Sequence, residues 1–171
     1  MIRWDSTLRE LRDYIRERWR ESDGVACPCC SQRVKLYRRT INRGQAEMLV
    51  AIAAETVRRR VQLEHFPWIH VEHEIIETGK GPARCRDWPL LRFWGLIEPR
   101  AGDNAETRRN PGLWRLTPGG LWAVEHPKRP LLAEFVEVYN NTKRGESPEK
   151  RSLAQALRRP FDFEEVRRRA A

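Results

Sequence analysis

The sequence predicts a mainly helical α+β protein. Its 171 residues, of which 40% are hydrophobic, suffice for one packed core. Apolar residues recur at steps of three and four from residue 4 to 19 and again from 42 to 61, which is the period of an amphipathic helix. Short β-prone stretches separate and follow these helices. We divide the chain into an N-terminal segment of residues 1–41, a core of 42–126 and a C-terminal extension of 127–171.

The N-terminal segment is predicted to be one helix followed by a cysteine-rich turn. The helix begins near Trp4 and ends near Trp19, with Arg and acidic residues on its polar face. Residues 22–24, Ser-Asp-Gly, end it, and a strand-like stretch at 33–37 follows the cysteines. In the C-terminal extension we expect a strand at 134–139, then a short helix and a tail that docks through its apolar residues.

The core is predicted to begin with a long helix, because Asn42 can cap its first turn and Gln45 stands three residues later. A β-prone stretch, two helical stretches, a strand, a polar loop and a returning strand follow. Their expected bounds are, in order, 67–71, 72–78, 82–94, 96–98, 100–112 and 113–117. Gly95 is expected to end the helix at 82–94. Thr117 can cap a last helix that has Pro118 at its first position.

The order helix, strand, helix, helix, strand, loop, strand is typical of a winged helix-turn-helix. The stretch from Leu91 to Gly120 resembles the recognition-helix end and wing of bacterial winged-helix repressors. It shares with them a leucine on the helix, a helix-ending glycine, a Leu-Ile strand and an aromatic-Arg-Leu-Thr strand before a glycine turn. The resemblance extends over about residues 42–125. It implies that the third helix enters the major groove of DNA and that the wing lies beside a phosphate backbone.

The resemblance also implies which arginines face DNA. They are Arg84, Arg86 and Arg92 on the helix at 82–94, and Arg100, Arg108 and Arg109 on the wing. An arginine in the major groove can bind guanine through two hydrogen bonds or neutralise a phosphate, and one sequence leaves both roles open. We expect the arginines of the wing to neutralise phosphates. Asp87 and Pro89 depart from the pattern of a recognition helix, and a solvated face is the other interpretation of these arginines.

Several stretches along the chain carry a second resemblance. They are Cys27 to Gln32, Lys35 to Arg39, the core itself, Val138 to Asn141 and Phe161 to Phe163. Together they resemble a family of small bacteriophage-encoded proteins. This resemblance implies a phage or prophage origin and no particular activity. Combined with the winged-helix resemblance, it implies a transcriptional regulator that forms a homodimer through the first helix or the C-terminal extension.

The charge of the chain indicates a polyanionic partner. Thirty-three Lys and Arg against 24 Asp and Glu give a net charge of +9, and most of the cations are Arg, whose planar guanidinium suits phosphate. Duplex DNA is the predicted partner. No apolar run approaches the ~20 residues that cross a bilayer, and the first residues lack the apolar middle of a signal peptide. We therefore expect a cytoplasmic protein that does not bind a membrane.

Four cysteines make a metal the other expected partner, because a reducing compartment favours metal sites and free thiols over disulfides. Cys27 and Cys30 have the two-residue spacing of a zinc knuckle, which supplies half of a tetrahedral site. His70 and His73 would complete a Cys2His2 set, and Cys85 is an alternative to one histidine. A zinc ion bound there is expected to be structural. In the other interpretation, the cysteines are small hydrophobic residues without a metal.

Other functions compete with DNA binding. The sequence has no paired carboxylates in an apolar setting, no nucleophile beside its base and no phosphate-binding loop, so we do not expect an enzyme. The second interpretation is a phage factor that docks on a host protein and inhibits or redirects it, because seven Trp beside many Arg match the composition of binding hot spots. Most of these Trp fall at core positions, with Trp68 and Trp88 as exceptions. The third is RNA binding through Tyr37, Tyr139 and Asn140-Asn141.

Overall fold

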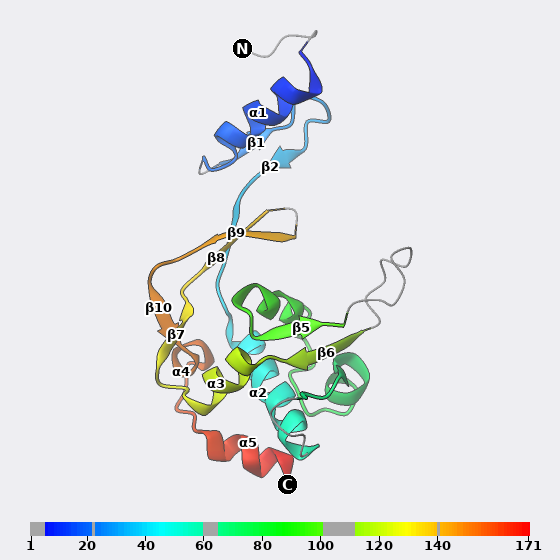
Figure 1. Ribbon diagram of the computed structural model, residues 1–171, viewed down its shortest axis with the longest axis vertical. Coiled ribbons are helices and arrows are strands. Elements are labelled where there is room, and N and C mark those ends of the chain that lie inside the picture. Colours follow the sequence, from blue (N-terminus) through cyan, green and yellow to red (C-terminus); the bar gives the residue numbers. More distant parts are fainter. Residues whose placement is uncertain (1–5, 22, 60–64, 101–111, 140) are drawn as a thin grey trace. The chain divides into compact units, whose positions relative to one another are not determined.

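The computed structural model describes residues 6–21, 23–59, 65–100, 112–139 and 141–171. It combines helices with antiparallel sheets and is of the α+β class that the sequence predicts (Figure 1). The chain forms two compact units, each of which combines two separate segments of the sequence. Unit 1 consists of Met1–Arg39 and Val136–Glu146, and unit 2 of Thr40–Phe135 and Ser147–Ala171. Within the described ranges, no helix has both the length and the apolar character that crossing a membrane requires.

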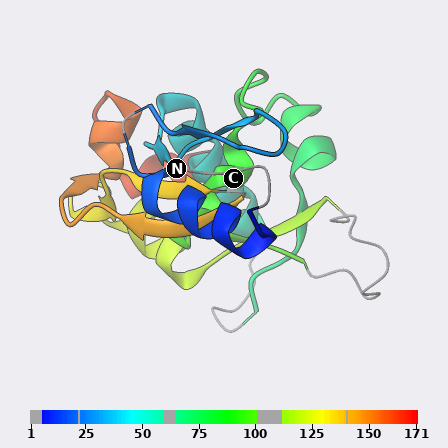
Figure 2. The same ribbon diagram turned by 90° about the horizontal axis from the view of Figure 1, so that it is seen from above.

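In the described part of unit 1 there are one helix and two small sheets. Helix α1 (Leu8–Arg18) begins at Thr7, whose hydroxyl accepts the backbone N–H of Glu10, while the Glu10 carboxylate accepts that of Thr7. The strands are β1 (Val25–Ala26), β2 (Arg33–Val34), β3 (Tyr37–Arg39), β8 (Val136–Tyr139) and β9 (Thr142–Glu146). β1 pairs with β2, and the other three form an antiparallel sheet in the order β3–β8–β9. Figure 1 labels β1, β2, β8 and β9, and Figure 2 shows the same ribbon from above. The Trp19 ring meets Tyr139 edge-on, with 4.6 Å between centroids.

Unit 2 is built around helix α2 (Arg43–Arg58). The predicted N-terminal cap is confirmed, since Asn42 and Gln45 each accept the backbone N–H of the other. Most residues of α2 are buried, because other elements of the unit cover it on several sides. The helices packed against it are α3 (Pro118–Glu125), α4 (Leu153–Leu157) and α5 (Phe163–Ala170). The core of unit 2 therefore lies along α2.

A three-stranded antiparallel sheet also packs in unit 2. Its strands are β4 (Ile69–His70), β6 (Leu113–Leu116) and β5 (Ile97–Pro99), in that order. Ile97 faces Leu116 across the β5–β6 pair, and Ile69 faces Trp114 across the β4–β6 pair. All four of these side chains are buried, so this sheet contributes directly to the core. Between β4 and β5 lie a one-turn π-helix, η1 (Glu72–Ile76), and a 3₁₀ helix, η2 (Trp88–Trp94).

A second, two-stranded sheet joins the last part of unit 2 to the rest. β7 (Pro130–Ala133) pairs with β10 (Lys150–Ser152), which leads directly into α4. The indole N–H of Trp94 donates to the carbonyl of Ala133 at 2.8 Å and so ties η2 to β7. After α4, the tail docks as expected, because Phe161 and Val166 are buried while the arginines of α5 stay exposed. Of the strand predicted at 134–139, residues 136–139 form β8.

The expected helix over residues 82–94 is wrong in its first half. Residues 82–87 form turns, and only Trp88–Trp94 are helical, as η2. Pro89 explains the difference, because its ring fits the first turn of a helix but removes a donor and clashes inside one. Gly95 ends η2 as expected, in the left-handed conformation at φ +69°. The strand expected at 33–37 is also divided, into β2 and the start of β3.

Candidate nucleic-acid interface

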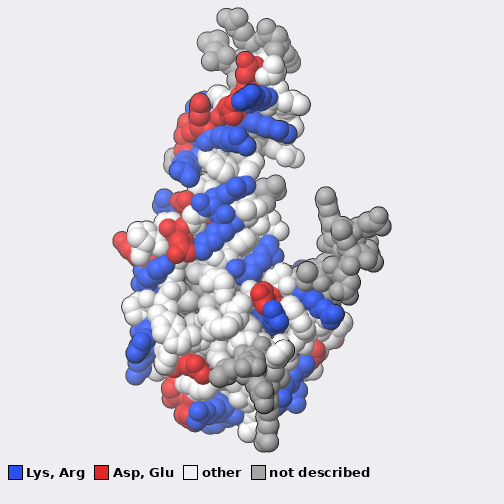
Figure 3. Space-filling view, viewed as in Figure 1, with Lys and Arg blue, Asp and Glu red and all other residues white. Residues whose placement is uncertain are grey.

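Exposed Lys and Arg side chains occur on both units (Figure 3). Asp and Glu lie between many of them, and several form ion pairs at the surface. Such exposed pairs contribute little to stability, but they neutralise the cations concerned. The net charge of +9 therefore does not by itself define an interface. An interface is defined instead by the local structure around each predicted arginine.

Arg84 and Arg86 lie together on one exposed turn before η2. The N–H of Arg86 donates to the carbonyl of Arg84 at 3.2 Å. Both residues line a pocket of about 240 Å³, whose other wall is the first turn of α2 with Asn42 and Gly44. The N-terminal end of a helix carries partial positive charge, which adds to that of the two guanidinium groups. Asp87 is the acidic residue that lines the same pocket.

Buried residues of unit 2 hold the turn that carries Arg84 and Arg86 in place. The buried side chain of Gln45 donates from Nε2 to the carbonyl of Asp87 at 2.8 Å, so the residue that caps α2 also anchors the turn. The buried Trp88 ring then meets Trp114 of β6 edge-on, with 4.9 Å between centroids. Cys85 is half-buried under the turn, and burial raises the pKa of its thiol. Arg84 and Arg86 are thus exposed side chains on a well-supported backbone.

The other predicted arginines are placed differently. Arg92 is half-buried on η2, and its guanidinium lies 4.8 Å from the centre of the Phe93 ring. Arg100 is exposed just after β5, where its N–H donates to the carbonyl of Leu113 at 2.9 Å. Arg108 and Arg109 fall outside the described residues. The structure therefore brings Arg84 and Arg86 to one pocket, and Arg92 does not line that pocket.

Arg115 is a cation of this sheet that the sequence reasoning did not single out. It lies on β6, opposite Glu98 of β5, and forms an ion pair with that carboxylate. Its guanidinium also lies 4.5 Å from the centre of the Trp68 ring. Trp68, expected to be exposed, is in fact half-buried. The alternation of residues 113–116 was the signal that could have placed Arg115 on the outward face of the strand.

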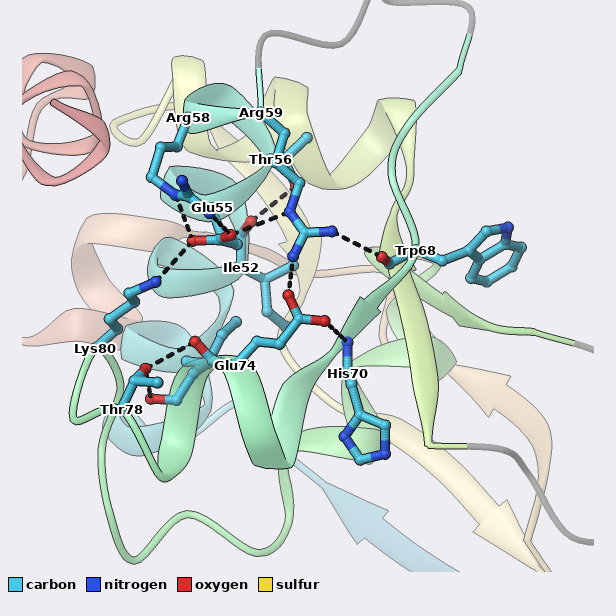
Figure 4. A network of polar contacts seen from close by, with 11 residues as sticks. Ile52, Glu55, Thr56, Arg58, Arg59, Trp68, His70, Glu74, Thr78 and Lys80 are labelled. Carbon is cyan, nitrogen blue, oxygen red and sulfur yellow. Dashed lines mark hydrogen bonds and ion pairs between the residues drawn. The ribbon is translucent and has the colours of Figure 1, made fainter.

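A buried carboxylate lies at the centre of the polar contacts of unit 2. Glu55 of α2 is 3% exposed, although it stands in the apolar stretch that fills the core (Figure 4). Its oxygens accept from Nε of Arg59 at 3.0 Å and Nζ of Lys80 at 3.1 Å, and they also pair with Arg58. These hydrogen bonds, first that of Arg58, lower the pKa of Glu55 from its usual 4.5 to about 2. The carboxylate is therefore ionised at neutral pH.

The network extends from Glu55 to the segment before the turn. Arg59 also donates to the carbonyl of Trp68 at 3.2 Å and pairs with Glu74 of η1 (Figure 4). Glu74 in turn accepts the backbone N–H of His70 at 2.8 Å. Every charge in this set has an opposite partner. We interpret the network as structural: it fixes β4 and η1 on α2.

The cysteines predicted to form a knuckle lie in the turn between β1 and β2 of unit 1. The N–H of Ser31 donates to the carbonyl of Cys27 at 2.8 Å, and the N–H of Cys27 donates to the carbonyl of Gln32 at 2.8 Å. Cys27 is half-buried, and Cys29 and Cys30 are exposed. Backbone N–H groups, first that of Cys30 and then that of Cys29, lower the pKa of Cys27. The turn therefore favours a thiolate at Cys27.

The predicted histidine ligands belong to unit 2. The rings of His70 and His73 stack with 4.0 Å between centroids, and the N–H of His73 donates to Nδ1 of His70 at 3.4 Å. Nδ1 of His73 lies 2.9 Å from the Glu77 carboxylate. Across the residues that the structure describes, His, Cys, Asp and Glu do not gather in groups of three or more that could hold a metal ion. The predicted cysteine ligands belong to unit 1 and the predicted histidine ligands to unit 2.

Comparisons with protein families, with curated proteins and with solved structures found no match to this chain. The resemblances to winged-helix repressors and to phage proteins therefore stay predictions.

Proposed function

We propose that the protein binds duplex DNA through a winged helix in unit 2 and acts as a phage or prophage transcriptional regulator. The observation that carries this proposal is the order of elements from α2 to β6. A helix, a strand, two short helical segments and two antiparallel strands follow one another, and the sequence between the last two strands, residues 100–112, is the loop predicted to be the wing. This order, together with the positive charge, supports DNA as the ligand.

The turn before η2 refines the proposed mode of binding. Trp88, Leu91 and Phe93 of η2 are buried, so this helix offers few side chains to the edges of bases. Arg84 and Arg86 stand instead on the preceding turn, beside the positive end of α2. We therefore propose that they neutralise phosphates and that binding depends strongly on salt and weakly on base sequence. Arg100, Arg108 and Arg109 of the wing are proposed to grip the flanking backbone.

Fluorescence anisotropy with a labelled duplex at two salt concentrations tests this proposal. We expect the double variant Arg84→Ala/Arg86→Ala to bind the duplex about tenfold or more weakly at low salt, and the slope of log affinity against log salt to fall by about 2. The double variant Lys128→Ala/Arg129→Ala is the control, because it removes two exposed charges of the same unit at another turn. It should bind within about twofold of the wild type.

Two results would overturn the duplex proposal. One is a folded wild-type protein that does not bind the duplex at low salt, which would favour docking on a host protein. The other is an equal loss of affinity in both double variants, which would mean that only the net charge matters. Far-UV circular dichroism of each variant shows that it is folded.

We further propose that Cys27 and Cys30 bind a structural zinc ion. The support is the β1–β2 hairpin, which presents both thiols from one turn, and the backbone N–H groups that favour a thiolate at Cys27. We expect purified protein to retain about one equivalent of zinc and the variant Cys27→Ser/Cys30→Ser to retain none, as measured by elemental analysis. Cys85→Ser is measured beside it, because Cys85 of unit 2 is the expected alternative to one histidine ligand.

The histidine pair decides what completes the zinc site. If His70→Ala/His73→Ala also loses zinc, the predicted Cys2His2 set holds; if it retains zinc, the other two ligands come from elsewhere. Protein that contains no zinc after growth and purification with zinc present, and that does not take it up in a titration, would contradict the zinc proposal.

A further inference from the structure

A chain of basic side chains runs along α1 and the residues that follow it in unit 1. Arg12 and Arg16 are one helical turn apart, about 6 Å along the axis, and Arg20 continues the row. With Arg144 of β9 they line a groove of about 740 Å³. Trp19 and Tyr139 also line this groove, and the Arg144 guanidinium lies 5.7 Å from the centre of the Trp19 ring.

A second groove of unit 1 adjoins the first at Arg20. It measures about 670 Å³ and is lined by Arg20, Lys35 and Tyr37, among others. Tyr37 is 48% exposed, and the guanidinium of Arg39 lies 5.2 Å from the centre of its ring. Because Arg20 lines both grooves, the two grooves meet at this residue, and each is lined by cations together with at least one aromatic ring.

The ion pairs of unit 1 leave these two grooves positively charged. Of the acidic residues that line the two grooves, Glu21 pairs with Arg18 at 2.7 Å and Glu137 pairs with Arg38 at 3.3 Å. Glu17 is the third. Among the described residues, no carboxylate pairs with Arg12, Arg20 or Lys35, and Arg16 has only an exposed contact of 3.7 Å to Asp13. The grooves thus present several available cations and few available acids.

We propose that unit 1 binds single-stranded nucleic acid along these two grooves, independently of the duplex site proposed for unit 2. Arg12, Arg16 and Arg20 bind consecutive phosphates, and a base stacks on the exposed ring of Tyr37. Cationic grooves with exposed aromatic rings are the means by which proteins hold single strands, because every base has a face that can stack. In a duplex the bases stack on each other. We therefore do not expect a base of a duplex to stack on the Tyr37 ring.

Anisotropy of the full-length protein with a labelled oligo-dT strand, and with a duplex of the same length, tests the proposal. We expect Arg12→Ala/Arg20→Ala to weaken oligo-dT binding by about tenfold or more. Tyr37→Ala should weaken it about tenfold and Tyr37→Phe should leave it near the wild-type value, because phenylalanine keeps the ring. Lys128→Ala/Arg129→Ala in unit 2 is again the control for the loss of two charges, and it should be close to the wild type.

The outcomes separate this proposal from the one for unit 2. Retained oligo-dT binding in Arg84→Ala/Arg86→Ala, with duplex binding lost, would support two independent sites. If Tyr37→Ala binds oligo-dT as tightly as the wild type does, no base stacks there and the proposal is overturned. It is equally overturned if Arg12→Ala/Arg20→Ala loses affinity for the duplex and keeps it for oligo-dT. Circular dichroism of each variant confirms that the loss is not one of folding.

Discussion

Glu55→Gln is expected to lower the free energy of unfolding of unit 2 by about 3 kcal/mol at pH 7. The native environment lowers the pKa of Glu55 from its usual 4.5 to about 2, and this difference in proton affinity is itself a stabilisation of the folded state. The variant keeps the shape of the side chain but leaves Arg58, Arg59 and Lys80 without their shared anion. No other side-chain carboxylate of α2 is so deeply buried.

The pH dependence of this effect has a defined sign. Because the folded pKa lies below the unfolded one, the contribution of Glu55 is complete above pH 4.5 and is lost as the pH falls toward 2. The difference between wild type and variant should thus narrow to roughly half or less near pH 3. Urea unfolding followed by tryptophan fluorescence at several pH values measures it.

Glu47→Gln is the control for Glu55→Gln. Glu47 lies on the same helix and pairs with Arg43 at 2.8 Å, but both side chains are more exposed. Loss of this ion pair should lower the free energy of unfolding by about 0.5 kcal/mol or less. A Glu55→Gln effect that stays constant from pH 7 to pH 3 would show that the charge of Glu55 is not the source of the stabilisation.

Gly120→Ala is the second substitution with a large expected effect. Gly120 lies in the first turn of α3, and an added Cβ would stand 2.1 Å from the carbonyl oxygen of Leu96. That oxygen belongs to the backbone and already accepts the N–H of Thr117 at 3.1 Å, so it cannot move without breaking the joint between β5 and β6. We expect Gly120→Ala to lower the free energy of unfolding by about 2 kcal/mol or more.

The neighbouring glycine provides a matched control for Gly120→Ala. At Gly119, the nearest atom to an added Cβ is the carbonyl oxygen of Gly95, at an ordinary 3.6 Å. Because alanine favours a helix over glycine, Gly119→Ala should be neutral or stabilise by up to about 1 kcal/mol. Urea unfolding of both variants decides the matter. Equal stabilities would mean that α3 is free to shift away from β5.

Local signals in the sequence predicted much of the fold. Asn42 and Gln45 define the start of α2, and Gly95 defines the end of η2, because caps depend on residues that are close in the chain. Pro89 stood in the sequence as a departure from a recognition helix, and it does delay the start of η2. The spacing of residues alone could not show that the turn before η2, with Arg84 and Arg86, would be more exposed than η2 itself.

The candidate site depends on contacts that no local pattern reveals. Gln45 reaches the carbonyl of Asp87, and Glu55 reaches Lys80, across long separations in the sequence. Glu55 looks like an interruption of an apolar stripe until its three cationic partners are known. The grooves of unit 1 combine α1 with β3, β8 and β9, so the arginines of the first helix could not be assigned a role before the strands were paired.

Unit 1 takes β8 and β9 from a segment that interrupts unit 2 between Phe135 and Ser147. The N–H of Ser147 donates to the carbonyl of Phe135 at 2.9 Å, so the chain leaves unit 2 and re-enters it at one point, between the paired strands β7 and β10. Without β8 and β9, a tight turn could close that hairpin. Residues 1–39 alone, however, would leave β3 without a partner. A gene can therefore gain or lose unit 1 intact only through coordinated changes at two separate places in its coding sequence.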